Sequence, residues 1–282
     1  MILPAMAELP LLVPPPLPQP ILCVGVTGHR DSNPAFAANA DAIAAVIDAV
    51  CNAIAAAAGP APVRLHSLLA DGTDQLAATA ALARGWELVA PLPFGRHLNL
   101  AINAHPASPS DARRLLAGQQ AEQPETAARA EALDRLAAQA RLFELADGDA
   151  AITPLFLAMT DAPGDVPAAQ RYASAASRRV ALAGRVMIEQ SDLVIAVWDG
   201  ASRDAVGGTG HTLSSALAAG TTLILIDARA PQDWRVLNAL EALEHRGDNS
   251  NRAAQLEAVV AAAIAPPSGT EAAANALAAN AW

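Results

Sequence analysis

The stretch SDLVIAVWDGASRDAVGGTGHTLSSALAAG, Ser191 to Gly220, reads as a buried strand, a glycine-bearing loop and the start of a helix. A second buried strand, TTLILID, follows at Thr221 to Asp227. Leu193 to Trp198 is an uninterrupted apolar run between two aspartates, which is typical of a parallel strand covered on both faces. Gly207 to Thr209 then open a helix, whose free backbone N–H groups and positive dipole end favour an anion, best a phosphate.

Strands and helices alternate along the chain before this stretch. Further strands are expected over Ile21 to Gly28, Val63 to Ala70 and Trp86 to Phe94. Helices are expected over Pro34 to Ala58, Gln75 to Arg84 and Ala168 to Gln190. Asp71 and Thr73 are alternative N-caps for the second of these helices. This alternation predicts an α/β fold of the Rossmann-like, doubly wound type, with a mostly parallel sheet and helices on both faces.

Other segments are less regular. His97 to Gln123 predicts a loop with a short helix over Ser110 to Leu116. Glu125 to Leu145 has the spacing of an amphipathic helix, although ARLFEL near its end also fits a strand. Asp147 to Val166 leaves a short strand and a lid as alternatives. Helices are also expected in two segments after the last strand, Asp233 to His245 and Asn251 to Ile264.

Length and composition favour one domain. The chain has 282 residues, of which 53% are hydrophobic, enough to bury one large core. We expect the domain over residues 21–265, after a proline-rich extended leader at 1–20 and before a flexible alanine-rich tail at 266–282. The leader has no basic n-region and is broken by prolines, and no other apolar run reaches the roughly 18 residues of a membrane helix. A cytoplasmic protein is therefore expected.

Charge and cysteine usage exclude several classes of function. The chain contains no lysine, and its 18 basic residues against 28 acidic ones give a net charge of −10, which argues against a general nucleic-acid-binding surface. Arginine can still bind a phosphate or carboxylate locally. Cys23 and Cys51 are expected to be buried apolar residues, because neither lies in a metal-binding or redox motif. The histidines show no metal-ligand spacing, so neither a metal nor a cofactor is predicted.

Four loops that follow predicted strands meet at one rim of such a sheet. They are TGHR at Thr27 to Arg30, DGTD at Asp71 to Asp74, the strand end at Trp198 to Gly200, and GGTG at Gly207 to Gly210. The candidate ligand-binding residues within them are Gly28, His29, Arg30, Gly72, Thr73, Asp74, Asp199, Gly200, Gly207, Gly208, Thr209 and Gly210. Several of these residues also have a purely structural interpretation. In it, the glycines are needed only for the backbone geometry of the turns, Arg30 for an ion pair with a nearby carboxylate and Asp74 for its favourable charge at a helix N-terminus.

These motifs together resemble the SLOG superfamily. TGHR, then LLADGTDQLAATAALARGWELVAPLPF, then SDLVIAVWDG followed by GGTG, occur in the order of that group over roughly residues 21–227. The superfamily includes the DNA-processing Smf proteins, the LOG cytokinin-activating phosphoribohydrolases and nucleotide-sensing domains of bacterial conflict systems. The resemblance implies a Rossmann-like fold that binds a nucleotide or nucleotide derivative, and it supports His29 and Arg30 as ligand contacts.

The chain departs from the phosphoribohydrolase pattern at one place. Those enzymes carry PGGxGTxxE, whose glutamate acts with an upstream arginine to cleave the bond between base and ribose. Here GGTG is followed by HTLS, which contains no carboxylate. Asp199 or Asp204 could take the place of that glutamate only through a different geometry of the site. By location, the residues that resemble the upstream arginine are Arg178, Arg179 and Arg185, and Arg178 is included among the candidate ligand-binding residues.

The first functional hypothesis is therefore a non-catalytic module that binds a nucleotide-derived small molecule, such as a signal. In it, Gly207 to Gly210 and the TGHR loop bind phosphate, and Asp74 or Asp199 binds ribose hydroxyls. The alternative is a LOG-like phosphoribohydrolase, which would need a displaced carboxylate at the rim. DNA binding of the DNA-processing type comes third, because the acidic balance opposes it. The expected partner is the small ligand, and a homo-oligomer is left open.

Overall fold

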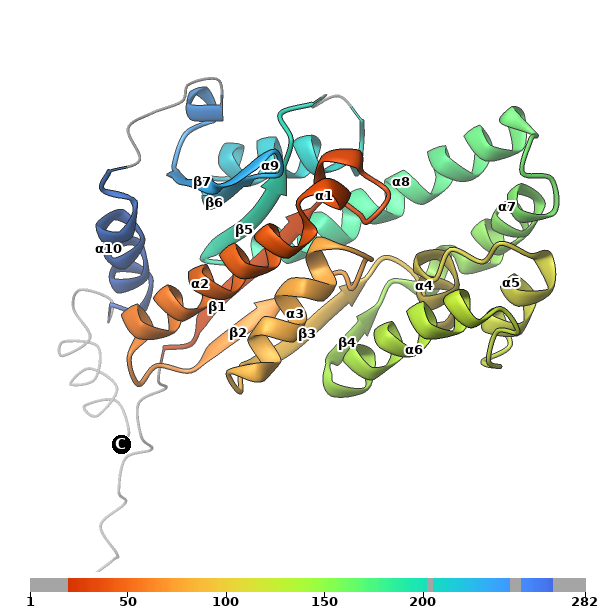
Figure 1. Ribbon diagram of the computed structural model, residues 1–282, viewed down its shortest axis with the longest axis horizontal. Coiled ribbons are helices and arrows are strands. Elements are labelled where there is room, and N and C mark those ends of the chain that lie inside the picture. Colours follow the sequence, from red (N-terminus) through yellow and green to blue (C-terminus); the bar gives the residue numbers. More distant parts are fainter. Residues whose placement is uncertain (1–19, 202–204, 244–249, 266–282) are drawn as a thin grey trace, which may run out of the picture.

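The computed structural model describes residues 20–201, 205–243 and 250–265 (Figure 1). The predicted tail and nearly all of the predicted leader lie outside these residues. The described chain contains a seven-stranded sheet with the order β4-β3-β2-β1-β5-β6-β7. Its strands are β1 (Leu22–Gly28), β2 (Val63–His66), β3 (Glu87–Leu92), β4 (Arg141–Glu144), β5 (Leu193–Trp198), β6 (Thr222–Asp227) and β7 (Ala230–Leu237).

Only β7 pairs antiparallel within this sheet, and all other neighbours are parallel. The chain runs outward from β1 to β4 and then returns to place β5 on the other side of β1. This reversal puts a topological switch point between β1 and β5, where Thr27 pairs with Ala196. Ligands of doubly wound sheets bind beyond the strand ends at such a point. The α/β prediction is confirmed.

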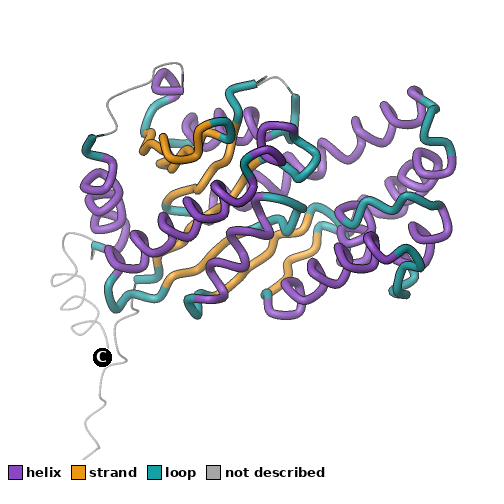
Figure 2. Tube along the Cα trace, in the orientation of Figure 1, coloured by secondary structure: helices purple, strands orange, loops and turns teal. Residues whose placement is uncertain are grey.

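Helices cover both faces of the sheet (Figures 1 and 2). They are α1 (Pro34–Ala38), α2 (Ala40–Ala58), α3 (Thr73–Ala83), α4 (Arg96–Asn103), α5 (Pro109–Leu116), α6 (Pro124–Gln139), α7 (Asp149–Asp161), α8 (Val166–Glu189), α9 (Thr209–Ala218) and α10 (Arg252–Ile264), with short 3-10 turns at Ala146–Gly148 and Leu240–Leu243. The helices on the two faces cover different side chains of β5, which alternate between the faces.

Leu193, Ile195 and Val197 pack in the core under α2, α3 and α10. Val194, Ala196 and Trp198 pack under α8 and α9.

A third hydrophobic cluster lies in a helical lobe beyond the carboxyl ends of β3 and β4. It joins α4, α5 and α7 to the N-terminal half of α8, with Phe94, Leu98 and Phe156 among its buried members. In Figure 1 this lobe extends from the sheet on the side of β4. The short helix predicted over Ser110 to Leu116 is confirmed as α5. The preceding residues, predicted as a loop, form α4, because Leu98, Ala101 and Ile102 give it a buried face.

Of the two alternatives for Asp147 to Val166, the short strand is wrong, and the lid stays a prediction. This segment forms α7, which includes Pro154 and buries Ile152 and Phe156. ARLFEL, the last part of the expected amphipathic helix, contains β4, which pairs parallel with β3. Pairing with a distant strand decided this local ambiguity, as often happens for short apolar runs.

Two further helix predictions need correction. Asp233 to His245 is not a helix: its first residues belong to β7, which pairs with β6 after the chain reverses at Ala228 and Arg229. Residues 244–249 lie outside the described residues. The expected helix over Pro34 to Ala58 is divided at Asn39, whose side-chain amide donates to the backbone oxygens of Ala35 (3.1 Å) and Ala228 (3.0 Å).

Helix α2 is long and apolar enough, by length and composition, to span a membrane. The expectation that no segment after the leader is long and apolar enough to span a membrane is therefore wrong for this helix. In the fold, however, one side of α2 is built into the core, where Ile43, Ile47 and Ile54 are fully buried. Asp41 and Asp48 are exposed on the same helix. The core helix of a globular α/β domain meets the same criterion.

Candidate functional site

A cavity of about 540 Å³ lies at the switch point, between the carboxyl ends of β1 and β5 and the N-terminus of α9. The predicted site residues that line it are Gly28, His29, Arg30, Asp74, Gly207, Gly208, Thr209 and Gly210. Its apolar wall includes Leu68, Met187 and Trp198. The other predicted residues do not line the cavity; these are Gly72, Thr73, Arg178, Asp199 and Gly200.

The glycine loop forms one side of the cavity. Gly207 has a φ of +75°, and a Cβ atom there would lie 2.6 Å from the backbone oxygen of Ser177 in α8. Only glycine satisfies both conditions, so the loop packs directly against α8. Gly208 is the N-cap of α9, but its own N–H donates to the Ala205 oxygen at 2.8 Å.

The free donors of this loop begin at Thr209, two residues after the start of the predicted stretch Gly207 to Gly210. The first intrahelical hydrogen bond of α9 is donated by the Thr212 N–H to the Gly208 oxygen, at 3.0 Å. The N–H groups of Thr209, Gly210 and His211 precede it, so they are the unsatisfied donors of the helix start. Since these groups and the helix dipole act together, this end of α9 can bind an anion.

Gly72 and Thr73 shape the TGHR loop instead of lining the cavity. Thr73 donates from its hydroxyl (2.9 Å) and from its backbone N–H (3.1 Å) to the backbone oxygen of His29. A Cβ atom on Gly72 would lie 2.7 Å from that same oxygen, and the φ of Gly72 is +81°. On the other side, the His29 N–H donates to the Val197 oxygen at 3.1 Å. The loop is therefore clamped between α3 and β5.

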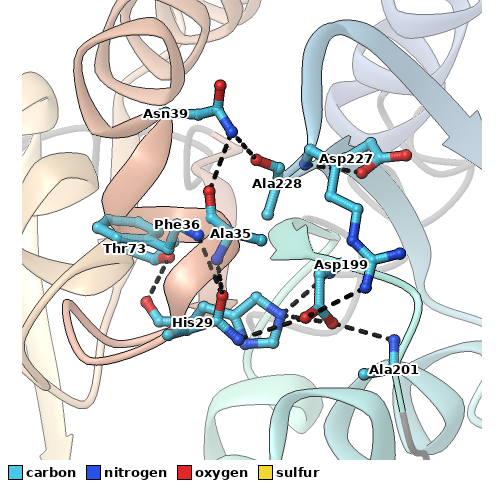
Figure 3. A network of polar contacts seen from close by, with 11 residues as sticks. His29, Ala35, Phe36, Asn39, Thr73, Asp199, Ala201, Asp227 and Ala228 are labelled. Carbon is cyan, nitrogen blue, oxygen red and sulfur yellow. Dashed lines mark hydrogen bonds and ion pairs between the residues drawn. The ribbon is translucent and has the colours of Figure 1, made fainter.

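Asp199 is the centre of a polar network at this strand end (Figure 3). Its Oδ1 lies 2.9 Å from His29 Nε2, and its backbone N–H lies 3.0 Å from the same nitrogen. A protonated Nε2 donates to the carboxylate, whereas an unprotonated one accepts from the N–H. The carboxylate also accepts from the side chain of Asn33 (3.3 Å) and the N–H of Ala201 (3.0 Å).

This environment lowers the pKa of the Asp199 carboxyl. Partial burial acts to raise it, but the hydrogen bonds from Ala201 and Asn33 and the His29 contact outweigh burial. The ionised carboxylate thus orients the His29 ring within the cavity wall. A direct contact between Asp199 and ribose stays a prediction. Gly200 follows in the left-handed region with a φ of +78° and forms the turn out of β5.

Asp74 is the buried carboxyl of the cavity, with only 5% of the residue exposed. Its Oδ2 accepts from the Ser67 hydroxyl (3.0 Å) and the Ala70 N–H (3.3 Å). Burial raises its pKa to about 6, against the opposing effect of these hydrogen bonds. Because a carboxyl with this pKa changes protonation around pH 6, Asp74 can accept or donate a proton inside the cavity.

Arg30 is tied to the helical lobe by a cluster that the sequence did not indicate. Its guanidinium lies 3.0 Å from Oδ1 of Asp71, and His105 Nε2 lies 3.1 Å from the same oxygen. Burial would raise the pKa of Asp71, but the His105 hydrogen bond and the Arg30 charge hold it below its usual value. His105 follows α4 and is distant in sequence from DGTD, so no local pattern could have revealed the contact.

The arginines of α8 do not reach the cavity. Arg178 lines a different groove, between α7 and α8. Arg179 contacts the Asp147 carboxylate and the Leu145 oxygen in the lobe. Arg185 is exposed and does not line the cavity. Arg178 thus lies outside the cavity lining, and its predicted contact with the ligand stays a prediction.

Within the described residues, no cluster of histidine, cysteine and carboxylate side chains could hold a metal ion. Comparison with protein-family models and with curated proteins finds no match to this chain. The SLOG resemblance therefore stays a prediction, and the assignment of a ligand rests on the cavity itself.

Proposed function

We propose that this chain binds a nucleotide or a nucleotide derivative in the cavity between β1 and β5, as a cytoplasmic sensor of the SLOG type. One observation carries the proposal. The cavity of about 540 Å³ lies at the switch point of a doubly wound sheet, and the N-terminus of α9 forms part of its wall. Sites for small ligands typically have volumes of about 300–1,000 Å³. A nucleotide provides the phosphate anion for the helix end and an aromatic base whose face can pack against the apolar wall.

The residues suggest a division of roles. The phosphate binds to the N–H groups of Thr209 and Gly210, and Arg30, which also lines the cavity, can donate from the part of its guanidinium that Asp71 does not contact. The base lies against Leu68, Met187 and Trp198, where an aromatic ring gains burial. Asp74 is within the cavity and can accept a hydrogen bond from a ribose hydroxyl. Differential affinity of the ligand for two states of the protein would then transmit the signal.

Asp74 also favours a second candidate function, hydrolysis of the bond between base and ribose. Asp74 is a cavity carboxyl with a pKa raised to about 6, whereas the HTLS segment after the glycine loop contains no carboxylate. Such a group could guide water or protonate a leaving base. Binding remains the preferred function for two reasons. The Asp74 carboxylate already accepts hydrogen bonds from Ser67 and Ala70. Among the described residues that line the cavity, there is no second carboxyl.

The test is to incubate the purified protein with nucleotides, NAD, ADP-ribose and cyclic nucleotides, and to identify the retained and free pools by mass spectrometry. We expect an intact nucleotide on the protein and no accumulation of free base. Gly208→Asp should reduce retention at least about tenfold, because its carboxylate adds a negative charge beside the donors of α9. Its Cβ would also lie 2.9 Å from the Ala205 oxygen.

Gly164→Asp is the matched control, since a Cβ atom there has no neighbour within 4 Å. It adds the same charge outside the cavity and should retain the nucleotide fully. Thermal unfolding of both variants separates loss of the site from loss of the fold. Free base produced in proportion to protein and time would establish the hydrolase instead, and retention of no compound would refute both functions.

A further inference from the structure

The helical lobe contains a second groove, of about 530 Å³, which shares no lining residue with the nucleotide cavity. It follows the N-terminal half of α8 beside α7, and these two helices pack together at the far end of the lobe (Figure 1). Its apolar lining comes from Leu155, Pro167 and Ala175. Arg171 and Arg178 line it as well, so one groove combines apolar surface with positive charge.

These two arginines differ from most others in the chain. Arginines elsewhere typically pair with a carboxylate, as Arg113 does with Asp161 at 2.7 Å in the same lobe. Arg171 and Arg178 are exposed, and among residues 20–201, 205–243 and 250–265 neither has an ion-pair partner. Arg178 only approaches the Ser174 hydroxyl, at 3.4 Å. In a chain of net charge −10, the groove is thus a local concentration of unneutralised positive charge.

The two charges also have a regular spacing. Seven residues separate Arg171 from Arg178, which corresponds to about 10.5 Å along α8, or two helical turns. Ser174 lies between them on the groove, and Pro167 places one end of the groove at the first turn of α8, where the Asp165 carboxylate accepts from the Ala168 N–H. Val166, at the start of the helix, is 61% exposed and extends the apolar surface.

We infer that the α7–α8 groove binds an acidic amphipathic helix of a partner protein. Carboxylates two turns apart on that helix would pair with Arg171 and Arg178, and its apolar face would cover Leu155, Pro167 and Ala175. Helices with an apolar face commonly bind in grooves of this kind. Complementary charge then sets the orientation and the rate of association.

Two other ligands match the groove less well. A small inorganic anion would use the arginines but leave the apolar lining in water. A nucleic acid would bring many phosphates close to a strongly acidic chain, and the groove is lined by no aromatic side chain for base stacking. An acidic amphipathic helix uses both kinds of surface and presents only the charges that the two arginines neutralise.

The test measures fluorescence anisotropy of a labelled synthetic helix that has glutamates at seven-residue spacing and leucines on the adjoining face, titrated with the full chain. We expect binding that weakens as salt rises. The double variant Arg171→Gln, Arg178→Gln should weaken it about fivefold to tenfold, because each exposed charge pair contributes modestly. A peptide with glutamine in place of glutamate should show the same loss.

The control is the double variant Arg135→Gln, Arg141→Gln, which removes the same charge at exposed positions outside the groove. It should bind the peptide like the wild type. Equal weakening in both double variants, no peptide binding, or stronger binding of polyphosphate or DNA than of the peptide would each overturn the inference. Nucleotide retention is measured on the same variants and should be unchanged, so the failure of one proposal is distinguishable from the failure of the other.

Discussion

Replacing Gly72 with alanine should lower the free energy of unfolding by about 2–4 kcal/mol, a large fraction of the stability of a typical domain. Gly72 has a φ of +81°, which L-residues rarely adopt. An added Cβ would also lie 2.7 Å from the His29 oxygen and 2.9 Å from the Arg30 Cα. Both neighbours are backbone atoms of the TGHR loop, and two hydrogen bonds from Thr73 hold the His29 oxygen in place, so neither can move without disturbing the loop. Urea unfolding followed by circular dichroism measures the loss.

Gly85→Ala separates the two causes. Gly85 has a similar φ of +72°, but a Cβ atom there meets nothing within 4 Å. This control should therefore cost only the conformational strain of a left-handed residue, about 1–2 kcal/mol. Equal losses in the two variants would show that the close approach of Gly72 to the TGHR loop contributes nothing. A larger loss for Gly72→Ala, with weaker nucleotide retention below the unfolding temperature, would link this approach to the site.

Asp74→Asn should change the pH dependence of stability by about 3 kcal/mol. Burial raises the pKa of Asp74 from 3.8 to about 6 in the folded protein. The folded state therefore binds more protons than the unfolded state between these two values, and stability falls as pH rises through this window. Asparagine has no such ionisation, and its amide oxygen can still accept from Ser67 and Ala70. The variant should thus gain stability relative to the wild type from pH 4 to pH 8.

The measurement is the unfolding free energy of both proteins at a series of pH values. Asp233→Asn is the control, because Asp233 is exposed on β7. Its difference from the wild type should stay nearly constant over the same pH range. If the Asp74→Asn difference is also constant, the carboxyl is ionised in the folded protein at the pH of an ordinary aspartate, and its role as a proton acceptor or donor in the cavity is refuted.

Much of the candidate site could be predicted because its determinants are local. A parallel strand that is buried on both faces needs an apolar run, and Leu193–Trp198 provides one. The glycines after it permit a close turn and a helix start, so Gly207 and Gly208 could be assigned to the rim before any contact was known. The fold follows from the alternation of such segments, since parallel strands require crossover helices.

The errors arose where a distant partner decided the outcome. Residues 233–237 have helical composition but continue as a strand, because β6 offers an open edge after a tight reversal. For Arg178, which was assigned to the site from its place in sequence, the packing of α8 on the sheet places the side chain at the outer groove, and its contact with the ligand stays a prediction. Helical periodicity identifies which residues share a face, but not which face meets the cavity.

The amino-acid sequence by itself determined the α/β class, the five strands β1, β2, β3, β5 and β6, and the four loops at the rim. Hydrophobic periodicity, turn residues and glycines specify such features within a few residues. Only the tertiary structure decided the chemistry within the rim. It joined Asp199 to His29 and Asp71 to His105, and it buried Asp74 in the cavity wall. Desolvation and ion pairing depend on groups far apart in the chain, so they exist only after the sheet and the lobe have packed.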